Sequence, residues 1–252
     1  MNPMAQFEVK PWIPLHLGRY DISFTNQALW MFVVVGAASL LLSYAAMSRR
    51  LVPSRMQSMA ELSYEFVGSM IHSAAGEAGL RFFPLVFTIF IFVLFSNFFG
   101  LIPGSSTITA QIVITFALAA VVIATVIVTG FLKHGFGFLK LFVPKAPLLL
   151  LVLLVPIEIV SFLTRPISLS VRLFANMLAG HTMLKVFAGF VIALGATVVT
   201  PTPWFAPLSI APLFLIVAIT ALEILVAFLQ AYVFAILTCI YLNEALHLHE
   251  HH

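Results

Sequence analysis

Charged residues are scarce in this chain of 252 amino acids, where Lys, Arg, Asp and Glu together make up only 8%. Because 62% of the residues are hydrophobic and the mean hydropathy is +1.12, the sequence has too few polar groups to cover a water-soluble domain. The 12 basic residues form no cluster long enough to follow a nucleic-acid backbone, so no nucleic-acid partner is expected. This composition indicates a membrane protein.

Cysteine is nearly absent as well, since Cys239 is the only one. A single cysteine excludes a disulfide bond within the chain and any metal site built from several thiolates. We expect no cofactor and no resident metal. The C-terminal histidines, which we interpret as exposed groups that bind metal only incidentally, are His247, His249, His251 and His252.

Long uncharged apolar runs fill most of the chain. Runs of about 20 residues are long enough to cross a bilayer as helices. In lipid the backbone must satisfy its own hydrogen bonds, which only helices and closed barrels do. A barrel would show alternating segments of about ten residues, whereas these runs are continuously apolar. The sequence therefore predicts an all-α polytopic membrane protein with a single membrane domain over residues 1–252.

The first half of the chain divides into a tail and three ordinary spans. Residues 1–27 are predicted to form a polar N-terminal tail. Within 28–132, apolar runs of the length needed to cross a bilayer once occur at 28–47, 84–102 and 108–132. We therefore expect three upright transmembrane helices in this part of the chain.

The segment 54–75 differs from these spans, because its apolar residues recur at helical spacing with polar residues between them. That pattern is typical of an amphipathic helix that lies in the membrane interface. Ser58 and Glu61 are three residues apart and predict a capping box near its start. We expect an interfacial helix here rather than a fourth span.

Two further apolar segments, 147–194 and 207–242, are too long for ordinary spans. As single helices they would measure roughly 70 Å and 54 Å at about 1.5 Å per residue, whereas the hydrocarbon core is about 30 Å thick. No turn signal interrupts 159–185. We therefore expect two long, strongly tilted membrane helices. Six or seven ordinary spans, with a turn near Arg165, are the alternative.

The distribution of basic residues predicts the orientation of the chain in the membrane. Basic residues gather in the segments 48–83 and 133–146, whereas the segments 103–107 and 195–206 carry no charge. Segments rich in Lys and Arg remain on the inner side of the membrane. We therefore expect the N-terminus outside and the C-terminus inside.

Ionisable residues within the membrane segments are few, and such residues usually mark ion paths. Glu158, Arg165 and Arg172 follow one another at intervals of seven, which places them on one face of a helix together with Asn176. Glu158 and Arg165 can also form a purely structural ion pair, which remains an alternative to a role in transport.

Arg172 is the least expected of these residues, because a guanidinium stays charged wherever it lies. Glu158 is fourteen residues away, too far along the helix for a direct pair, and no other acid lies within one turn of Arg172. Its counter-charge must therefore come from another helix or from another protein.

The last long segment and its surroundings carry a second polar group. Glu223 and Gln230 are seven residues apart and share a helix face, while His181 lies on a different face from Arg172. For Gln230 and for Asn97 of an earlier span, hydrogen bonding between helices is an alternative reading. His181 can likewise do no more than donate to a carbonyl.

Four stretches of this sequence resemble subunit a of the rotary F-type ATP synthases. The string SLSVRLFANMLAGH at 168–181 is similar to that family's signature around its essential arginine, and PIEIVSFLTRPIS at 156–168 to the approach to it. SNFFGLIPGS at 96–105 resembles the end of the family's second span, and ALEILVAFLQAYVFAILTCIYLNEALHLH at 221–249 its last helix. The resemblance covers the chain from about Gln6 to its end.

This resemblance implies a fold and a set of functional residues. One span, an interfacial helix and two more spans would precede two inclined helices within 147–246, which form the proton path beside a ring of c subunits. Arg172 would face the ring, and Glu158 would lie on the exit side. The residues implied along the entry half-channel are Asn176, His181, Glu223 and Gln230.

The resemblance also implies a role for the whole chain. It would be a non-catalytic stator subunit with two offset half-channels, coupling proton flow to rotation of the c-subunit ring and to ATP synthesis elsewhere in the complex. Implied partners are that ring, the peripheral-stalk b subunits, other synthase subunits and membrane lipid. No oxygen-ligand cage suggests Na⁺, so H⁺ is the expected ion.

The sequence also bears on the membrane in which the protein lies and on alternative functions. Abundant alanine favours a bacterial inner membrane over a mitochondrial one. A proton-pumping respiratory subunit and an anion carrier centred on the arginine are the alternatives. A carrier should show internal repeat symmetry, and the two halves of this sequence show none.

Overall fold

The first helix of the protein is preceded by two short antiparallel strand pairs. The computed structural model describes residues 11–14, 16–17, 20–21, 23–47, 53–102, 105, 107–142, 148–196 and 209–246. Strand β1 (Pro11–Ile13) pairs with β4 (Phe24–Thr25), and β2 (His16–Leu17) pairs with β3 (Tyr20–Asp21). Part of the predicted tail is therefore ordered as strands. The four C-terminal histidines lie outside the described residues.

The predicted spans of the first half of the chain are confirmed as helices. The elements in order are α1 (Asn26–Met47), α2 (Arg55–Gly79), η2 (Leu80–Phe82), α3 (Phe83–Gly100), η3 (Ile108–Ala110), α4 (Ile112–His134) and η4 (Gly135–Phe142). The third span begins later than predicted, because residues 108–110 form the separate 3₁₀ turn η3. Pro84 lies in the first turn of α3, where its missing N–H leaves no helical bond unmade.

The predicted interfacial helix is α2, but its start differs from the prediction. The Oγ atom of Ser54 accepts the backbone N–H of Gln57 at 3.3 Å, so Ser54 is the N-cap. The expected capping box of Ser58 and Glu61 is wrong, because Ser58 already lies inside the helix and Glu61 accepts from the Gln57 side chain at 2.8 Å. Gly76 kinks α2 near its end with a φ of 63°.

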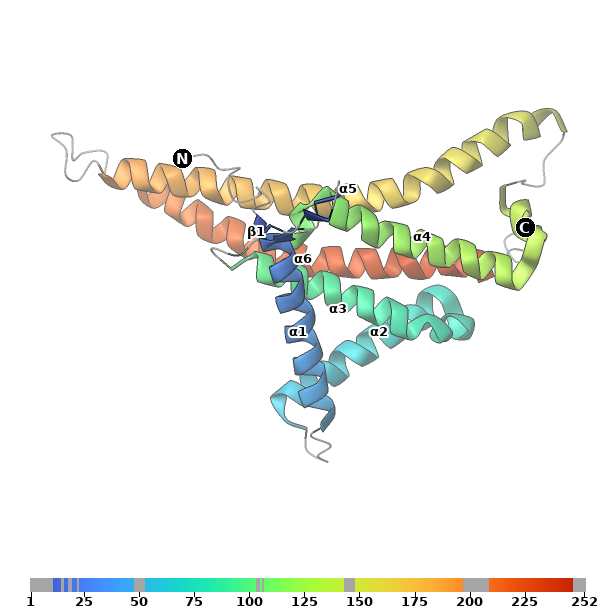
Figure 1. Cartoon of the computed structure of the whole chain (residues 1–252), viewed down its shortest axis with the longest axis horizontal. Helices are drawn as coiled ribbons and strands as arrows, with labels where there is room; N and C mark the ends of the chain where they lie inside the picture. The colour runs from blue at the N-terminus through green and yellow to red at the C-terminus, as the bar shows by residue number, and fades with distance from the viewer. Residues whose placement is uncertain are drawn as a thin grey trace.

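The two long segments are single helices, as predicted. Helix α5 (Leu148–Gly195) has 48 residues and α6 (Ile210–Leu246) has 37. Pro156 and Pro166 lie inside α5, and the helix curves along its length (Figure 1). The C-terminal half of α5 lies beside the N-terminal half of α6, and the two helices diverge towards the N-terminus of α5 (Figure 1). Their tilt from the bilayer normal stays a prediction.

Helix α6 is the centre of the packing, in contact with α2, α3, α4 and α5. Four alanines on α6 are fully buried: Ala227, Ala231, Ala235 and Ala245. Small residues allow membrane helices to approach closely, since packing rather than exclusion of water holds them together. The described helices include five segments long and apolar enough to cross a membrane. This arrangement leaves one side of α5 uncovered.

Candidate functional site

Arg172 projects from the uncovered side of α5. It is exposed, while Leu169, Leu173 and Met177 on the opposite side of the helix are buried against the other helices. Within the described part of the chain, the Arg172 side chain makes no hydrogen bond and no ion pair. The fixed positive charge is therefore directed away from the fold, as expected for a group whose counter-charge lies on another molecule.

On the buried side of α5, the helical turn that carries Arg172 contacts α4 through two hydroxyl groups. Ser170 Oγ and Thr115 Oγ1 of α4 are 3.1 Å apart, and both side chains are buried. Thr115 Oγ1 also donates to the Ile112 carbonyl at 3.1 Å. Because a buried hydroxyl needs a partner, this contact favours one rotation of α5, the one that turns Arg172 outward.

Asn176 lies one helical turn beyond Arg172 and connects the exposed side of α5 to α6. Its Nδ2 atom donates to Gln230 Oε1 at 3.1 Å. Asn176 is exposed, whereas Gln230 is buried. The amide pair therefore forms a polar link from the interior of the helix pair to the surface that bears Arg172.

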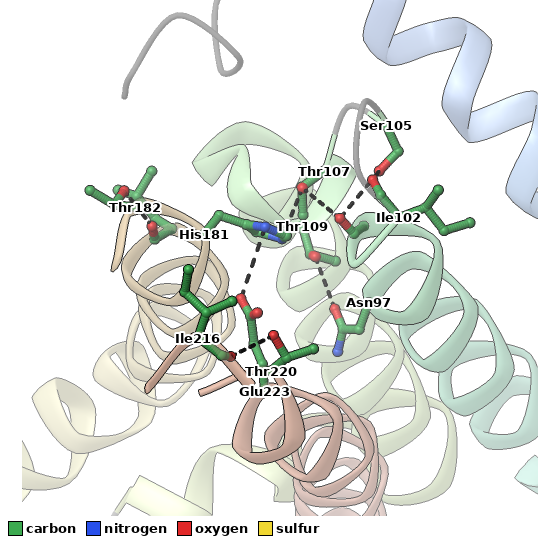
Figure 2. A network of polar contacts seen from close by, with 12 residues as sticks. Asn97, Ile102, Ser105, Thr107, Thr109, His181, Thr182, Ile216, Thr220 and Glu223 are labelled. Atoms are coloured by element: carbon green, nitrogen blue, oxygen red, sulfur yellow. Dashed lines mark hydrogen bonds and ion pairs between the residues drawn. The ribbon is translucent and has the colours of Figure 1, made fainter. Parts of the chain in front are cut away.

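His181 and Glu223 form a buried pair further along the same helices. His181 Nδ1 lies 3.9 Å from Glu223 Oε1, and the two residues are 8% and 2% exposed. Figure 2 shows the imidazole and the carboxylate facing each other between α5 and α6. Neither carboxylate oxygen of Glu223 has a hydrogen-bond partner among the described residues. A buried carboxylate without a hydrogen-bond partner in the described part of the chain is uncommon, so the pair is a candidate for a functional site.

Polar residues of α3 and of the η3 region close this buried site on another side. Thr107 Oγ1 lies 3.1 Å from His181 Nε2, and Thr109 Oγ1 donates to Asn97 Oδ1 at 2.9 Å (Figure 2). Asn97 Nδ2 in turn donates to the Ala227 carbonyl at 3.1 Å. The alternative reading of Asn97 as a hydrogen-bonding link between helices is thereby confirmed.

A second ionic cluster lies nearer the N-terminus of α5 and the C-terminus of α6. Arg165 forms an ion pair with Glu244 and approaches Glu158, with 3.8 Å between Nη2 and Oε1. The guanidinium also stacks on the rings of Phe162 and Tyr241, at 5.8 Å and 5.3 Å from their centroids. Arg165 therefore ties α5 to α6 and holds two carboxylates close together.

Known proteins that are similar in sequence identify the family of this chain. A family model described as ATP synthase A chain matches residues 28–243. The chain belongs to this family. It is 57% identical to ATP synthase subunit a of Mesorhizobium japonicum over 98% of this chain and 97% of that one. It is 60% identical to ATP synthase subunit a of Chelativorans sp. and 56% identical to that of Rhizobium meliloti, at 98% coverage of this chain.

Membership of the ATP synthase A chain family confirms the resemblance inferred from the arginine motif, and sets aside the respiratory subunit and the anion carrier. The structure brings together four of the predicted residues in two pairs: His181 with Glu223, and Asn176 with Gln230. Glu158 belongs to the separate cluster around Arg165.

Two residues that the structure places at these polar clusters, Glu244 and Thr107, were not predicted from the sequence. Glu244 lies 21 residues after Glu223, a multiple of seven, so the spacing that relates Glu223 to Gln230 could have found it. Thr107 had no such signal, because it contacts His181 across a separation of 74 residues.

Proposed function

We propose that this chain is the proton-translocating stator subunit of an ATP synthase, lies in a bacterial inner membrane, and performs no covalent chemistry itself. The observation that carries the proposal is the unpaired, exposed Arg172 on α5 in a chain of the ATP synthase A chain family. A permanent charge at membrane depth is costly without a counter-ion. A carboxylate on each subunit of an adjacent ring would supply that counter-ion.

The entry half-channel would run from the outer surface to the face of Arg172. His181 and Glu223 would receive the proton, because they form a buried, titratable pair with carboxylate oxygens free to accept it. The Asn176–Gln230 pair extends from this region towards the exposed side of α5 and would pass the proton on through ordered water. This order of groups supports entry from the end of α5 that carries His181.

At the ring, the proton would neutralise a carboxylate and allow it to enter lipid, since an ionised carboxylate is too costly there. After nearly a full turn the carboxyl group would lose its proton on the inner side and be attracted past Arg172. The guanidinium would thus separate the two half-channels and prevent a direct leak. Each proton that crosses the full potential releases roughly 2.3 kcal/mol per 100 mV, which rotation delivers to catalytic subunits.

The exit half-channel would open beside Glu158. Glu158 is held near Arg165, whose main partner is Glu244, so two carboxylates and one cation line this part of the α5–α6 pair. Such a cluster would attract water and protons on the inner side, where we expect the C-terminus from the loop charges. The assignment of Glu158 to the exit side and the additional role of Glu244 are both part of the proposal.

Purification of the intact complex provides the test. The chain should co-purify with a small ring-forming proteolipid and with stalk subunits of the b type, and inverted vesicles should acidify their interior when given ATP. Recovery of the chain without any proteolipid ring, from membranes that pump protons with ATP, would overturn the proposal.

A further inference from the structure

Two buried hydrogen bonds in series join the helix that carries Glu223 to α3 and to η3. Thr109 Oγ1 of η3 donates to Asn97 Oδ1 at 2.9 Å, and Asn97 Nδ2 donates to the Ala227 carbonyl of α6 at 3.1 Å. We propose that Thr109 is a positioning residue that acts through Asn97 on the placement of Glu223. The inference rests on the proposed function, in which Glu223 exchanges protons with His181, and adds to it the residue that sets the geometry of this pair.

The direction of both hydrogen bonds follows from the Ala227 carbonyl. A carbonyl oxygen only accepts, so the atom of the Asn97 amide that faces it is the donor Nδ2. The other atom of the amide is then Oδ1, which also only accepts, so the Thr109 hydroxyl must donate to it. Asn97 and Thr109 are both 0% exposed. Because a buried amide that loses a partner is left unsatisfied at a cost, the two bonds together favour one orientation of the Asn97 side chain.

The place of the Glu223 carboxylate depends on the backbone of α6. Neither of its oxygens has a hydrogen-bond partner among the described residues, so no hydrogen bond to any of them holds the group. Ala227 lies one turn after Glu223, and in an α-helix its N–H bonds to the Glu223 carbonyl. The bond from Asn97 therefore holds α6 at the turn that carries the acid, whose Oε1 atom lies 3.9 Å from His181 Nδ1.

The short turn η3 also contacts α5, so one element reaches both helices of the pair. Ala110 of η3 forms a buried apolar cluster with Met177 of α5 and Ala227 of α6. Thr107 immediately precedes η3, and its Oγ1 atom lies 3.1 Å from Nε2 of His181 (Figure 2). The η3 turn therefore sets the spacing between the helix that carries the histidine and the helix that carries the acid.

A disulfide cross-link between α5 and α6 measures this spacing without any proton transport. A Cβ atom at position 180 would lie 3.1 Å from Glu223 Cγ, which occupies the place that Sγ takes in a cysteine. This separation is close to what a disulfide requires. The whole complex therefore carries Gly180→Cys with Glu223→Cys, and Cys239→Ala removes the native thiol. An oxidant should then join α5 to α6, and the rate is measured per assembled complex.

Three variants in this cross-linking background test the role of the hydroxyl. Thr109→Val keeps the shape of the side chain but removes the donor, so the disulfide should form about tenfold more slowly. Thr109→Ser keeps the hydroxyl and should restore most of the rate. The matched control is Thr238→Val, since Thr238 is also 0% exposed but donates to the Phe234 carbonyl of its own helix. Its rate should stay within about twofold of the original.

A change at Asn97 tests whether Thr109 acts through this residue. Asn97→Leu removes both the acceptor for Thr109 and the donor to α6, so it should slow the cross-link as Thr109→Val does. Thr109→Val added to Asn97→Leu should slow it no further. A further slowing in the double variant would overturn the inference. A normal rate in Asn97→Leu would overturn it even if Thr109→Val fails to assemble.

Proton pumping connects this geometry to the proposed function. With residues 180 and 223 unaltered, Thr109→Val should lower ATP-driven pumping in inverted vesicles by about tenfold per assembled complex, and Thr109→Ser should restore most of it. Slow cross-linking with unchanged pumping in Thr109→Val would overturn the role of Thr109 in proton transfer alone. Unchanged pumping in both His181→Asn and Glu223→Gln would instead show that the buried pair carries no protons, and both proposals would fail together.

Discussion

Gly180 of α5 and the carboxylate of Glu223 on α6 occupy adjoining space, because a Cβ atom at position 180 would lie 2.3 Å from Glu223 Oε1. Glycine at this position therefore makes room for the buried acid beside His181. The neighbouring atom is the far end of a flexible side chain, so a larger residue at position 180 would move the carboxylate before it separated the helices.

Gly180→Ala should accordingly impair proton transport more than assembly. The displaced carboxylate would leave its position 3.9 Å from His181 Nδ1, and ATP-driven pumping in inverted vesicles should fall by about tenfold. Adding Glu223→Asp, which shortens the acid by one methylene, should recover part of the rate. Gly189→Ala is the control, since nothing lies within 4 Å of a Cβ atom there; equal rates for Gly180→Ala and Gly189→Ala would contradict the prediction.

The ion pair between Arg165 and Glu244 should contribute to the stability of the α5–α6 pair. Glu244→Gln leaves Arg165 with Glu158 alone, and we expect a loss of about 1–2 kcal/mol, less than for a fully buried pair because both side chains are partly exposed. A double-mutant cycle of Glu244→Gln with Arg165→Gln, read from thermal unfolding of the purified complex, measures the coupling. Strictly additive effects would show that the pair contributes nothing.

The accessible sides of the two half-channels can be mapped with a polar thiol reagent. Cys239 is first replaced by Ala, although it is buried. Cysteine at position 181 or 223 should react from the outer side, and cysteine at position 158 from the inner side. Cysteine at position 173, where Leu173 is fully buried, should react from neither side. Labelling of position 158 only from outside would reverse the assignment of the channels.

The sequence predicted the helices well because the lipid bilayer sets the length and the apolar character of a helix that crosses it. The segments 147–194 and 207–242 lack turn signals, and both are unbroken helices. The start of α2 was harder, since both Ser54 and Ser58 are acceptable caps from composition alone. Only the backbone geometry, extended at Ser54, selects between them.

The candidate site was predictable where its residues share one helix and not where they meet across helices. Intervals of seven placed Glu158 with Arg165, and the structure brings these two side chains together. The contacts of Thr107 with His181 and of Gly180 with Glu223 depend on how separate elements pack. No local pattern in the sequence encodes such distances.

Arg172 is expected to act through its fixed charge, so its substitution has sharply defined consequences. Arg172→Lys keeps a charge but loses the planar group of donors, so we expect this variant to lack coupled turnover. Arg172→Ala should also raise passive proton leak, because nothing then separates the two half-channels. Arg55→Ala is the control, since Arg55 is also an exposed arginine but lies on α2. The proton leak and the coupled turnover of this variant should match those of the unaltered complex.

The most direct measurement is ATP synthesis driven by a proton gradient, in inverted vesicles that carry Arg172→Ala and contain the same amount of assembled complex as the unaltered protein. A neutral side chain cannot attract the ring carboxylate out of its protonated, lipid-facing state, so synthesis should be abolished. Substantial coupled synthesis in this variant, with Glu223 and the ring unaltered, would contradict the role proposed for the exposed arginine of α5.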